Sequence, residues 1–255
     1  MRESTAELKT ADLVLEVMRR LLDETVAEET ALQWAAEQST RRLGGCAAGV
    51  LLADRGDGLR TAAATSSPAH ALQQVAAAHG EGPGPECIRR GESVLVPDLS
   101  ATEARWPEYA RTAKAAGIGA AGSFPLHHHN GGPTLGALNL FDARPGAMPG
   151  PRVAAAQDLA DALALGLRQR RKSQAAHCKI AQLQQALTSR VLIEQAKGML
   201  AERWQTDVQT AFDVLRKYAR AQQLRLVKVA GAVVERRPGA GPPAADRRQS
   251  GGSER

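Results

Sequence analysis

Residues 189–204 read SRVLIEQAKGMLAERW, and from Ile193 to Leu200 the apolar residues recur at helical spacing. Lys197 and Gly198 stand inside this helical segment. A glycine inside a helix costs about 1 kcal/mol relative to alanine, so Gly198 needs a packing or functional reason. We expect a close contact between helices that fixes where Lys197 points. The alternative is a tolerated glycine on a solvated helix.

Two further helical blocks follow this stretch. The first opens at Thr206, where Gln209 stands three residues later and completes a capping box. The second begins near Leu226. Three amphipathic helices with short links bury their apolar stripes against one another in a three-helix bundle. The residues that we expect in the core of this bundle are Ile193, Ala196, Gly198, Ala211, Phe212, Leu215, Ala219, Val229 and Ala230.

A long helix is predicted upstream of the bundle, over residues 152–186. The cluster RQRRK (168–172) breaks its apolar pattern, after which Ile180, Leu183 and Leu187 repeat at coiled-coil spacing. A helix of this kind can join two domains and can also pair with a second copy of itself. We therefore expect a homodimer, formed by this helix and by the N-terminal helices.

The first 150 residues carry a different pattern. Two N-terminal helices come first, with Leu15, Met18 and Leu22 on the apolar stripe of the first helix. Glycine and proline force GEGPGPE (80–86) into a loop. Short apolar runs predict strands over 46–54, 59–65, 93–98, 118–129 and 133–142. The order of these elements predicts an α+β fold, in which helices cover an antiparallel sheet.

These patterns divide the chain into four parts. We expect a first domain over residues 1–150, a connecting helix over 151–179, the helical bundle over 180–237 and a disordered tail over 238–255. The tail is rich in Pro, Gly and Arg, a composition that cannot build a packed core.

Composition indicates a globular protein without a membrane anchor. Hydrophobic residues make up 43% of the 255 and charged residues 24%, and no run of about 18 apolar residues occurs. The N-terminus lacks the apolar core of a signal peptide, so we expect a cytoplasmic protein. Cys46, Cys87 and Cys178 include no CxxC pair, and we interpret them as free thiols rather than zinc ligands or disulfides.

Charge is distributed unevenly along the chain. Residues 1–164 contain 15 Lys and Arg against 20 Asp and Glu, a balance of −5. Residues 165–255 contain 18 against 7, a balance of +11. A basic module attached to an acidic one is typical of a polyanion-binding domain joined to a regulatory domain.

Both domains resemble known families. ALTSRVLIEQAKGMLAERW (186–204), followed by AFDVLRKYAR (211–220) and LVKVAGAVVE (226–235), resembles the ANTAR domain, a three-helix RNA-binding module of bacterial transcription antiterminators. Upstream, GEGP, VPDL, RWPEYA, FPL and LGALNLF together resemble a GAF domain of actinobacterial sensors that carry a C-terminal ANTAR module. In such sensors the GEGP motif often runs into a cysteine, whereas here Cys87 comes later, which puts a thiol role for this segment in doubt.

The resemblance implies a signal-responsive regulator that binds RNA hairpins in nascent leaders, so that a competing terminator cannot form. Helices that present Arg and Lys suit the phosphates and unstacked bases of such hairpins. The candidate RNA-binding residues are Arg190, Lys197, Arg203, Arg216, Lys217, Arg220 and Lys228. The partner of the GAF domain would be a small molecule that the sequence does not identify.

Two alternatives remain open at the level of the sequence. A basic three-helix unit also suits a DNA-binding transcription factor, although its cations are spread over all three helices rather than concentrated on one recognition helix. The GAF-like part could instead be a catalytic or nucleotide-binding module with an accessory helical tail. We find no catalytic arrangement and expect no cofactor, and we interpret His127, His128 and His129 as a polar strand end rather than a metal site.

Overall fold

The computed structural model describes residues 2–54, 58–127 and 132–235. The expected tail over 238–255 and the segment 128–131, which includes the end of the strand predicted over 118–129, lie outside these residues. The chain divides into two compact units, Met1–Ser173 and Gln174–Arg255. Each unit has a hydrophobic core of its own.

The first unit is built on a five-stranded sheet in the order β2-β1-β5-β4-β3, and every pair of neighbouring strands is antiparallel. The strands are β1 (Ala47–Ala53), β2 (Leu59–Ala64), β3 (Val94–Val96), β4 (Ala120–Pro125) and β5 (Gly136–Asp142). In the centre of the sheet Val50 of β1 pairs with Leu138 of β5. This sheet confirms the predicted α+β fold.

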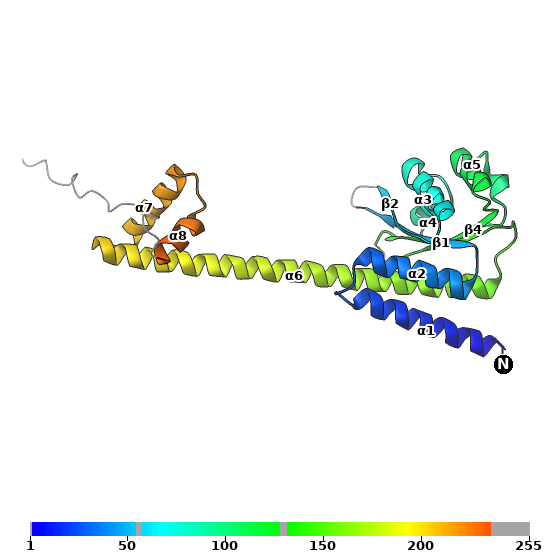
Figure 1. Cartoon of the computed structure of the whole chain (residues 1–255), viewed down its shortest axis with the longest axis horizontal. Coiled ribbons are helices and arrows are strands. Elements are labelled where there is room, and N and C mark those ends of the chain that lie inside the picture. Colours follow the sequence, from blue (N-terminus) through cyan, green and yellow to red (C-terminus); the bar gives the residue numbers. More distant parts are fainter. Residues whose placement is uncertain (1, 55–57, 128–131, 236–255) are drawn as a thin grey trace, which may run out of the picture. The chain divides into compact units, whose positions relative to one another are not determined.

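Helices cover both faces of the sheet (Figure 1). One face carries α1 (Arg2–Leu22), α2 (Glu28–Leu43) and the first part of α6 (Gly150–Trp204). The other carries α3 (Ser67–His79), α4 (Pro83–Arg90), the 3-10 helix η1 (Leu99–Thr102) and α5 (Pro107–Ala115). Because side chains alternate along a strand, Val50 and Leu52 enter the first core while Leu51 enters the second.

The apolar stripe that we predicted for α1 is not the one that the protein buries. Leu13, Val17 and Leu21 are buried in the core that α1 shares with α2 and α6, whereas Leu15 and Leu22 are 63% and 44% exposed. Helix α1 is apolar on two faces, so the spacing of its residues alone does not show which face packs.

The segment GEGPGPE is also not the loop that we predicted, because Pro83 begins α4. A proline suits the first turn of a helix, where a backbone N–H has no partner within the helix. Gly82 precedes the helix with a φ of 100°, and a Cβ at this position would lie 2.5 Å from the ring of Tyr109. The glycine is therefore required both by the backbone conformation and by the close approach of α5.

Helix α6 runs for 55 residues without a break, so the RQRRK cluster does not interrupt it. Arg170 from this cluster is buried, and its guanidinium donates to the carbonyl oxygens of Leu21 at 3.1 Å and Asp23 at 3.0 Å, and to that of Val26. These carbonyls lie at the C-terminal end of α1 and in the turn that follows. Such acceptors offset the cost of burying a cation.

The second unit consists of the last part of α6 with α7 (Val208–Ala221) and α8 (Leu226–Val234), as the sequence predicts. The N-cap of α7 is Asp207 rather than the expected Thr206, and its carboxylate accepts a hydrogen bond of 2.9 Å from the backbone N–H of Thr210. An acidic side chain at this place also interacts favourably with the positive end of the helix dipole. Among the described residues, no helix is long and apolar enough to cross a membrane.

Candidate nucleic-acid interface

The core of the second unit is small and consists mostly of alanine, leucine and valine. Of the residues that we expected there, Ile193 is partly buried, and the fully buried ones are Ala196, Ala211, Leu215, Ala219, Val229 and Ala230. Small side chains let the three helices approach closely, so longer side chains lie around the rim of the unit. The prediction was wrong for Gly198, and Phe212 lies only partly in the protein interior.

Gly198 is exposed, and no heavy atom lies within 4 Å of the position that a Cβ would take. It is therefore not a point of close contact between helices of this chain, which corrects our prediction. Gly166, earlier in the same helix, does have that role, because a Cβ there would lie 2.7 Å from the side chain of Leu21 in α1. Helix α6 therefore does contain a glycine at a close contact between helices, and this glycine is Gly166 rather than Gly198.

Six of the seven candidate RNA-binding cations are exposed. They are Arg190 and Arg203 on α6, Arg216, Lys217 and Arg220 on α7, and Lys228 on α8. The hydrophobic core does not cover them, so their charges are available to a partner in water. Their distribution over three helices makes the whole unit basic rather than one helix alone.

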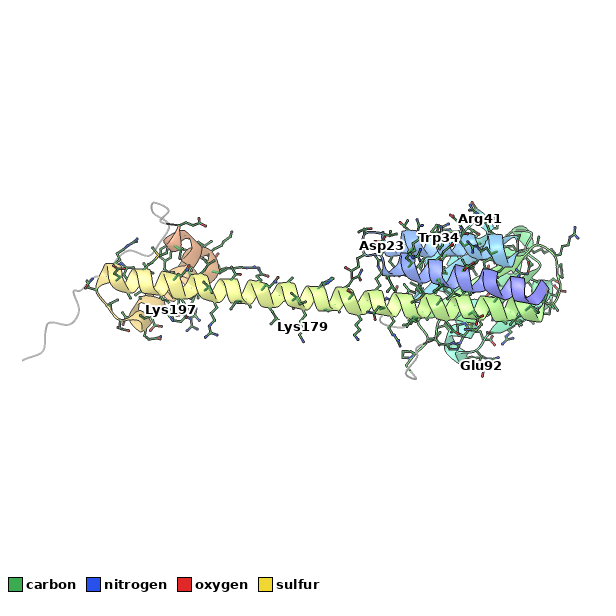
Figure 2. All side chains as sticks on the ribbon, turned by 90° about the horizontal axis from the view of Figure 1, so that it is seen from below. Asp23, Trp34, Arg41, Glu92, Lys179 and Lys197 are labelled. Carbon is green, nitrogen blue, oxygen red and sulfur yellow. The ribbon has the colours of Figure 1, made fainter. Side chains whose placement is uncertain are left out.

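Lys197 is the exception among the seven. Its side chain is only 15% exposed, and its ammonium lies 3.0 and 2.9 Å from the two carboxylate oxygens of Glu194. The same ammonium lies 5.1 Å from the centre of the Phe212 ring, the geometry of a cation–π contact. Lys197 therefore joins α6 to α7 through the Phe212 ring. Figure 2 labels its place on α6.

In the first unit, the segment before α4 holds two elements together through Glu81. Its carboxylate accepts hydrogen bonds from the backbone N–H groups of Glu108 at 2.9 Å and Tyr109 at 3.0 Å. These groups belong to the first turn of α5, which has no side-chain cap of its own. Glu81 thus caps a helix that begins 26 residues after it.

Helix α4 carries a buried carboxylate and a buried thiol. Glu86 is 6% exposed in its side chain and pairs with Arg90 at 3.0 Å and with Arg105, whose guanidinium stacks on Trp106. The neighbouring Cys87 is fully buried, and this burial raises the pKa of its thiol to about 12. A thiol of this kind stays protonated near neutral pH, and Cys87 is a free cysteine, as the sequence predicts.

Two polar side chains are buried on the sheet face beneath α4. The hydroxyl of Ser123 donates to the amide oxygen of Asn139 at 2.6 Å, between β4 and β5. Gly84 lies directly above them, since a Cβ there would be 3.2 Å from that amide oxygen and 3.3 Å from Leu51. Helix α4 therefore rests on the sheet at this point.

An open groove of this unit lies on the opposite face, beside α1, α2 and β2. It has a volume of about 490 Å³, and its lining residues are Arg20, Glu29, Thr30, Gln33, Trp34, Glu37 and Ala62. The guanidinium of Arg20 lies 5.0 Å from the Trp34 ring centre at one side of it. The charged residues of this groove have both signs, which favours no single class of ligand.

His127 is fixed by its neighbours and not by a metal-like cluster. Its two ring nitrogens lie 3.0 Å from the carboxylate of Asp161 and 3.0 Å from the carbonyl oxygen of Gly91. His128 and His129 lie outside the described residues. Within the described part of the chain, no three His, Cys, Asp or Glu side chains are arranged to hold a metal ion.

The family model of the GAF domain matches residues 25–168, which is more than half of the chain. The chain belongs to the GAF domain family. A second family model, the ANTAR domain, matches residues 181–234 and so covers the three helices of the second unit. A GAF domain followed by an ANTAR domain is the architecture of a signal-sensing regulator.

Solved structures resemble the GAF part of the chain. A domain of a protein described as a two-component sensor histidine kinase from Sinorhizobium meliloti 1021 is 21% identical, with a TM-score of 0.51, over 60% of this chain and 98% of that one. The GAF domain of a protein described as a sensor histidine kinase from Pseudomonas syringae pv. tomato is 17% identical, with a TM-score of 0.50, over 70% and 97%.

A free methionine-R-sulfoxide reductase from Neisseria meningitidis, solved with its substrate, is 19% identical, with a TM-score of 0.50, over 66% of this chain and 93% of that one. At this level of identity these likenesses show the fold alone, and an enzyme and sensor domains share it. No curated protein matches the chain in sequence.

Sequence reasoning missed two residues and one contact that shape these sites. Glu194 was not singled out, although its pairing with Lys197 was predictable from the sequence. Acidic and basic residues three positions apart on a helix are neighbours on its surface. The contact between Lys197 and Phe212 joins two helices, and helical spacing within either one does not predict it. Glu81 has a partner 27 residues away in the sequence, which no local pattern indicates.

Proposed function

We propose that this protein is a signal-responsive, RNA-binding regulator of transcription antitermination. Its GAF domain would sense a small molecule and control the ANTAR domain. The observation that carries the proposal is the set of six exposed cations on the three-helix unit that matches the ANTAR model. RNA offers a dense phosphate backbone, and exposed Lys and Arg bind it with release of counterions.

The proposed mechanism is a competition between RNA structures. The ANTAR domain binds a hairpin in the leader of a nascent transcript and stabilises it. While this hairpin persists, an overlapping terminator hairpin cannot form, and transcription continues. Since nascent bacterial transcripts are made in the cytoplasm, the proposal places the protein there.

Equilibrium binding of the full chain tests the RNA partner. We expect it to bind a synthetic stem–loop RNA with an affinity that falls steeply as salt rises, because several phosphate contacts are made. A duplex DNA of the same length serves as the control and should bind more weakly. Equal affinity for both would favour the DNA-binding alternative, and no salt-dependent binding of the RNA would overturn the proposal.

Transcription in vitro tests antitermination itself. The template would carry a leader in which the bound hairpin overlaps a terminator, and a matched template would carry mutations that prevent this hairpin. We expect the protein to raise read-through on the first template and to leave the second unchanged. An equal effect on both templates would show that RNA binding is not coupled to termination.

The support for a small-molecule ligand is the GAF family membership and the Ser123–Asn139 pair buried beneath α4. A ligand that reached this pair would have to displace Gly84 and the start of α4. Native mass spectrometry of the purified full chain tests it: a bound molecule should appear as an added mass. The loss of this mass in Asn139→Leu, with an unchanged melting temperature, would place it there.

A homodimer is part of the same proposal. Every residue of α6 from Gln174 to Thr188 is exposed. This stretch contains three apolar side chains at coiled-coil spacing, Ile180, Leu183 and Leu187, which are 50%, 62% and 65% exposed. An isolated helix with an exposed apolar side is only marginally stable in water. Pairing of this stretch with the same stretch of a second copy would cover the three side chains.

A further inference from the structure

The seven candidate RNA-binding cations of the C-terminal unit fall into two sets, and Lys197 is the reference point for both. Arg190 lies seven residues before Lys197, which is two turns, so both are on one side of α6. On α7, the ring of Phe212 contacts Lys197, and Arg216 and Arg220 follow it by one and two turns. We call this side of the unit the α6–α7 seam. It consists of Arg190, Glu194, Lys197, Phe212, Arg216 and Arg220.

The other three cations lie away from the seam. Arg203 is six residues after Lys197, a separation that turns it to a different side of α6. Lys217 is five residues after Phe212 and is turned away in the same manner on α7. Lys228 is on α8, which contributes no residue to the seam.

The seam differs from the other set in chemistry. Its three exposed cations are arginines, whose planar guanidinium groups bind phosphate through two parallel hydrogen bonds and stack on unpaired bases. Arg203, Lys217 and Lys228 lie on three different helices and include two lysines. A hairpin loop presents both phosphates and unstacked bases, so the seam fits it better than the scattered set.

Lys197 has a different role within the seam. Its ammonium is already bound by both oxygens of the Glu194 carboxylate and lies over the Phe212 ring. A phosphate would have to compete with that carboxylate for a side chain that is 15% exposed. The contact instead fixes the Phe212 ring, and Arg216 is exposed one turn further along α7.

We propose that RNA is bound along the α6–α7 seam by Arg190, Arg216 and Arg220, and that Lys197 is a positioning residue that holds Phe212 and makes no phosphate contact. The inference rests on the proposed RNA-binding function. The inference goes beyond that function because it distinguishes the cations that bind RNA from those that do not.

Salt-dependent binding of a synthetic stem–loop RNA by the full chain tests the seam. The variants Arg190→Ala, Arg216→Ala and Arg220→Ala should each weaken binding and reduce the slope of log K against log salt by about one phosphate contact. The matched controls Arg203→Ala, Lys217→Ala and Lys228→Ala remove the same charge from exposed positions and should leave the slope unchanged. Equal effects in both sets would overturn the seam. Absence of salt-dependent binding by the unsubstituted chain would overturn the proposed function itself.

Two substitutions of Lys197 test its positioning role. Lys197→Met keeps the aliphatic stem and removes the ammonium, so we expect a lower melting temperature and an affinity reduced by the same factor at every salt concentration. Its salt slope should remain that of the unsubstituted chain. Lys197→Arg keeps a cation over Phe212 and should restore both properties. A slope reduced by one contact in Lys197→Met would show that Lys197 binds phosphate directly.

Discussion

At the scale of single residues, Gly198 is open to substitution because its backbone is exposed and nothing lies within 4 Å of an added Cβ. Helix propensity alone then decides the effect on stability. We expect Gly198→Ala to raise the free energy of unfolding of the C-terminal unit by about 1 kcal/mol. Chemical denaturation followed by circular dichroism measures it. Higher stability combined with weaker RNA binding would show that the bare backbone at Gly198 lies against the RNA.

Gly166 is the matched control for this substitution, because it is a second glycine of the same helix. A Cβ there would approach the Leu21 side chain to 2.7 Å and would force α1 and α6 apart. We therefore expect Gly166→Ala to destabilise the first unit, the opposite sign from Gly198→Ala. The two substitutions together distinguish the low helix propensity of glycine, which both remove, from the steric clash, which arises only at Gly166.

Asp207 makes the stability of the C-terminal unit dependent on pH. Hydrogen bonds from the side chain and the backbone of Thr210 hold the pKa of this carboxyl below its usual value of 3.8. The ionised cap therefore stabilises α7 at pH values above 3.8, and this contribution is lost as the pH falls through the lower folded-state pKa.

We expect Asp207→Ala to lower the melting temperature of the C-terminal unit near neutral pH. The difference from the unsubstituted chain should shrink in acid, once both chains lack an ionised cap. Thr206→Ala is the control, since Thr206 is not the cap, and it should have little effect at either pH. A Thr206→Ala effect as large as that of Asp207→Ala would contradict the cap assignment.

Among the helices and strands, the exposed stretch of α6 over residues 174–188 leads to a prediction about the homodimer. Leu183→Glu and Leu187→Glu place a charge on the exposed apolar side of this helix, so we expect a dimer to dissociate into monomers. Gln185→Glu adds the same charge on the opposite side of the helix and is the control. Sedimentation velocity at micromolar concentration distinguishes the species, and an unsubstituted chain that sediments as a monomer would contradict the homodimer.

The strands were predictable from the sequence because short apolar runs bounded by Gly, Pro and Asp have few alternatives to a buried strand. The segment GEGPGPE was not, since glycine and proline are common both in loops and in the first turn of a helix. The packed face of α1 was also undetermined, because Leu13 and Leu15 belong to two apolar sides of one helix. Tertiary contacts decide such cases.

The candidate site shows the same limit. The exposed cations Arg216 and Arg220 followed directly from the polar side of an amphipathic helix. The state of Lys197 did not, because its cover comes from Phe212, fifteen residues later and on another helix. Helical spacing predicts which residues share a side, and the neighbouring helix determines whether that side is free.

At the scale of the whole molecule, the division into two units predicts that the second one is separable. Its core contains residues of α6, α7 and α8 only. We expect a fragment over residues 173–237 to fold alone and to bind the stem–loop RNA with the salt dependence of the full chain. Circular dichroism and the binding isotherm measure both. A fragment that is unfolded by itself would show that the bundle needs the rest of the chain or a second copy.

The cap that Glu81 provides for α5 bears on the order in which the first unit forms. Helix α5 has nine residues, too few to persist alone, and the carboxylate that satisfies its first turn arrives from a distant segment. Its folding therefore waits for a loop of the chain to close rather than for a local event. In pulsed hydrogen exchange during refolding, the amides of α5 should gain protection only when α4 has docked on the sheet, and Glu81→Gln should delay them selectively.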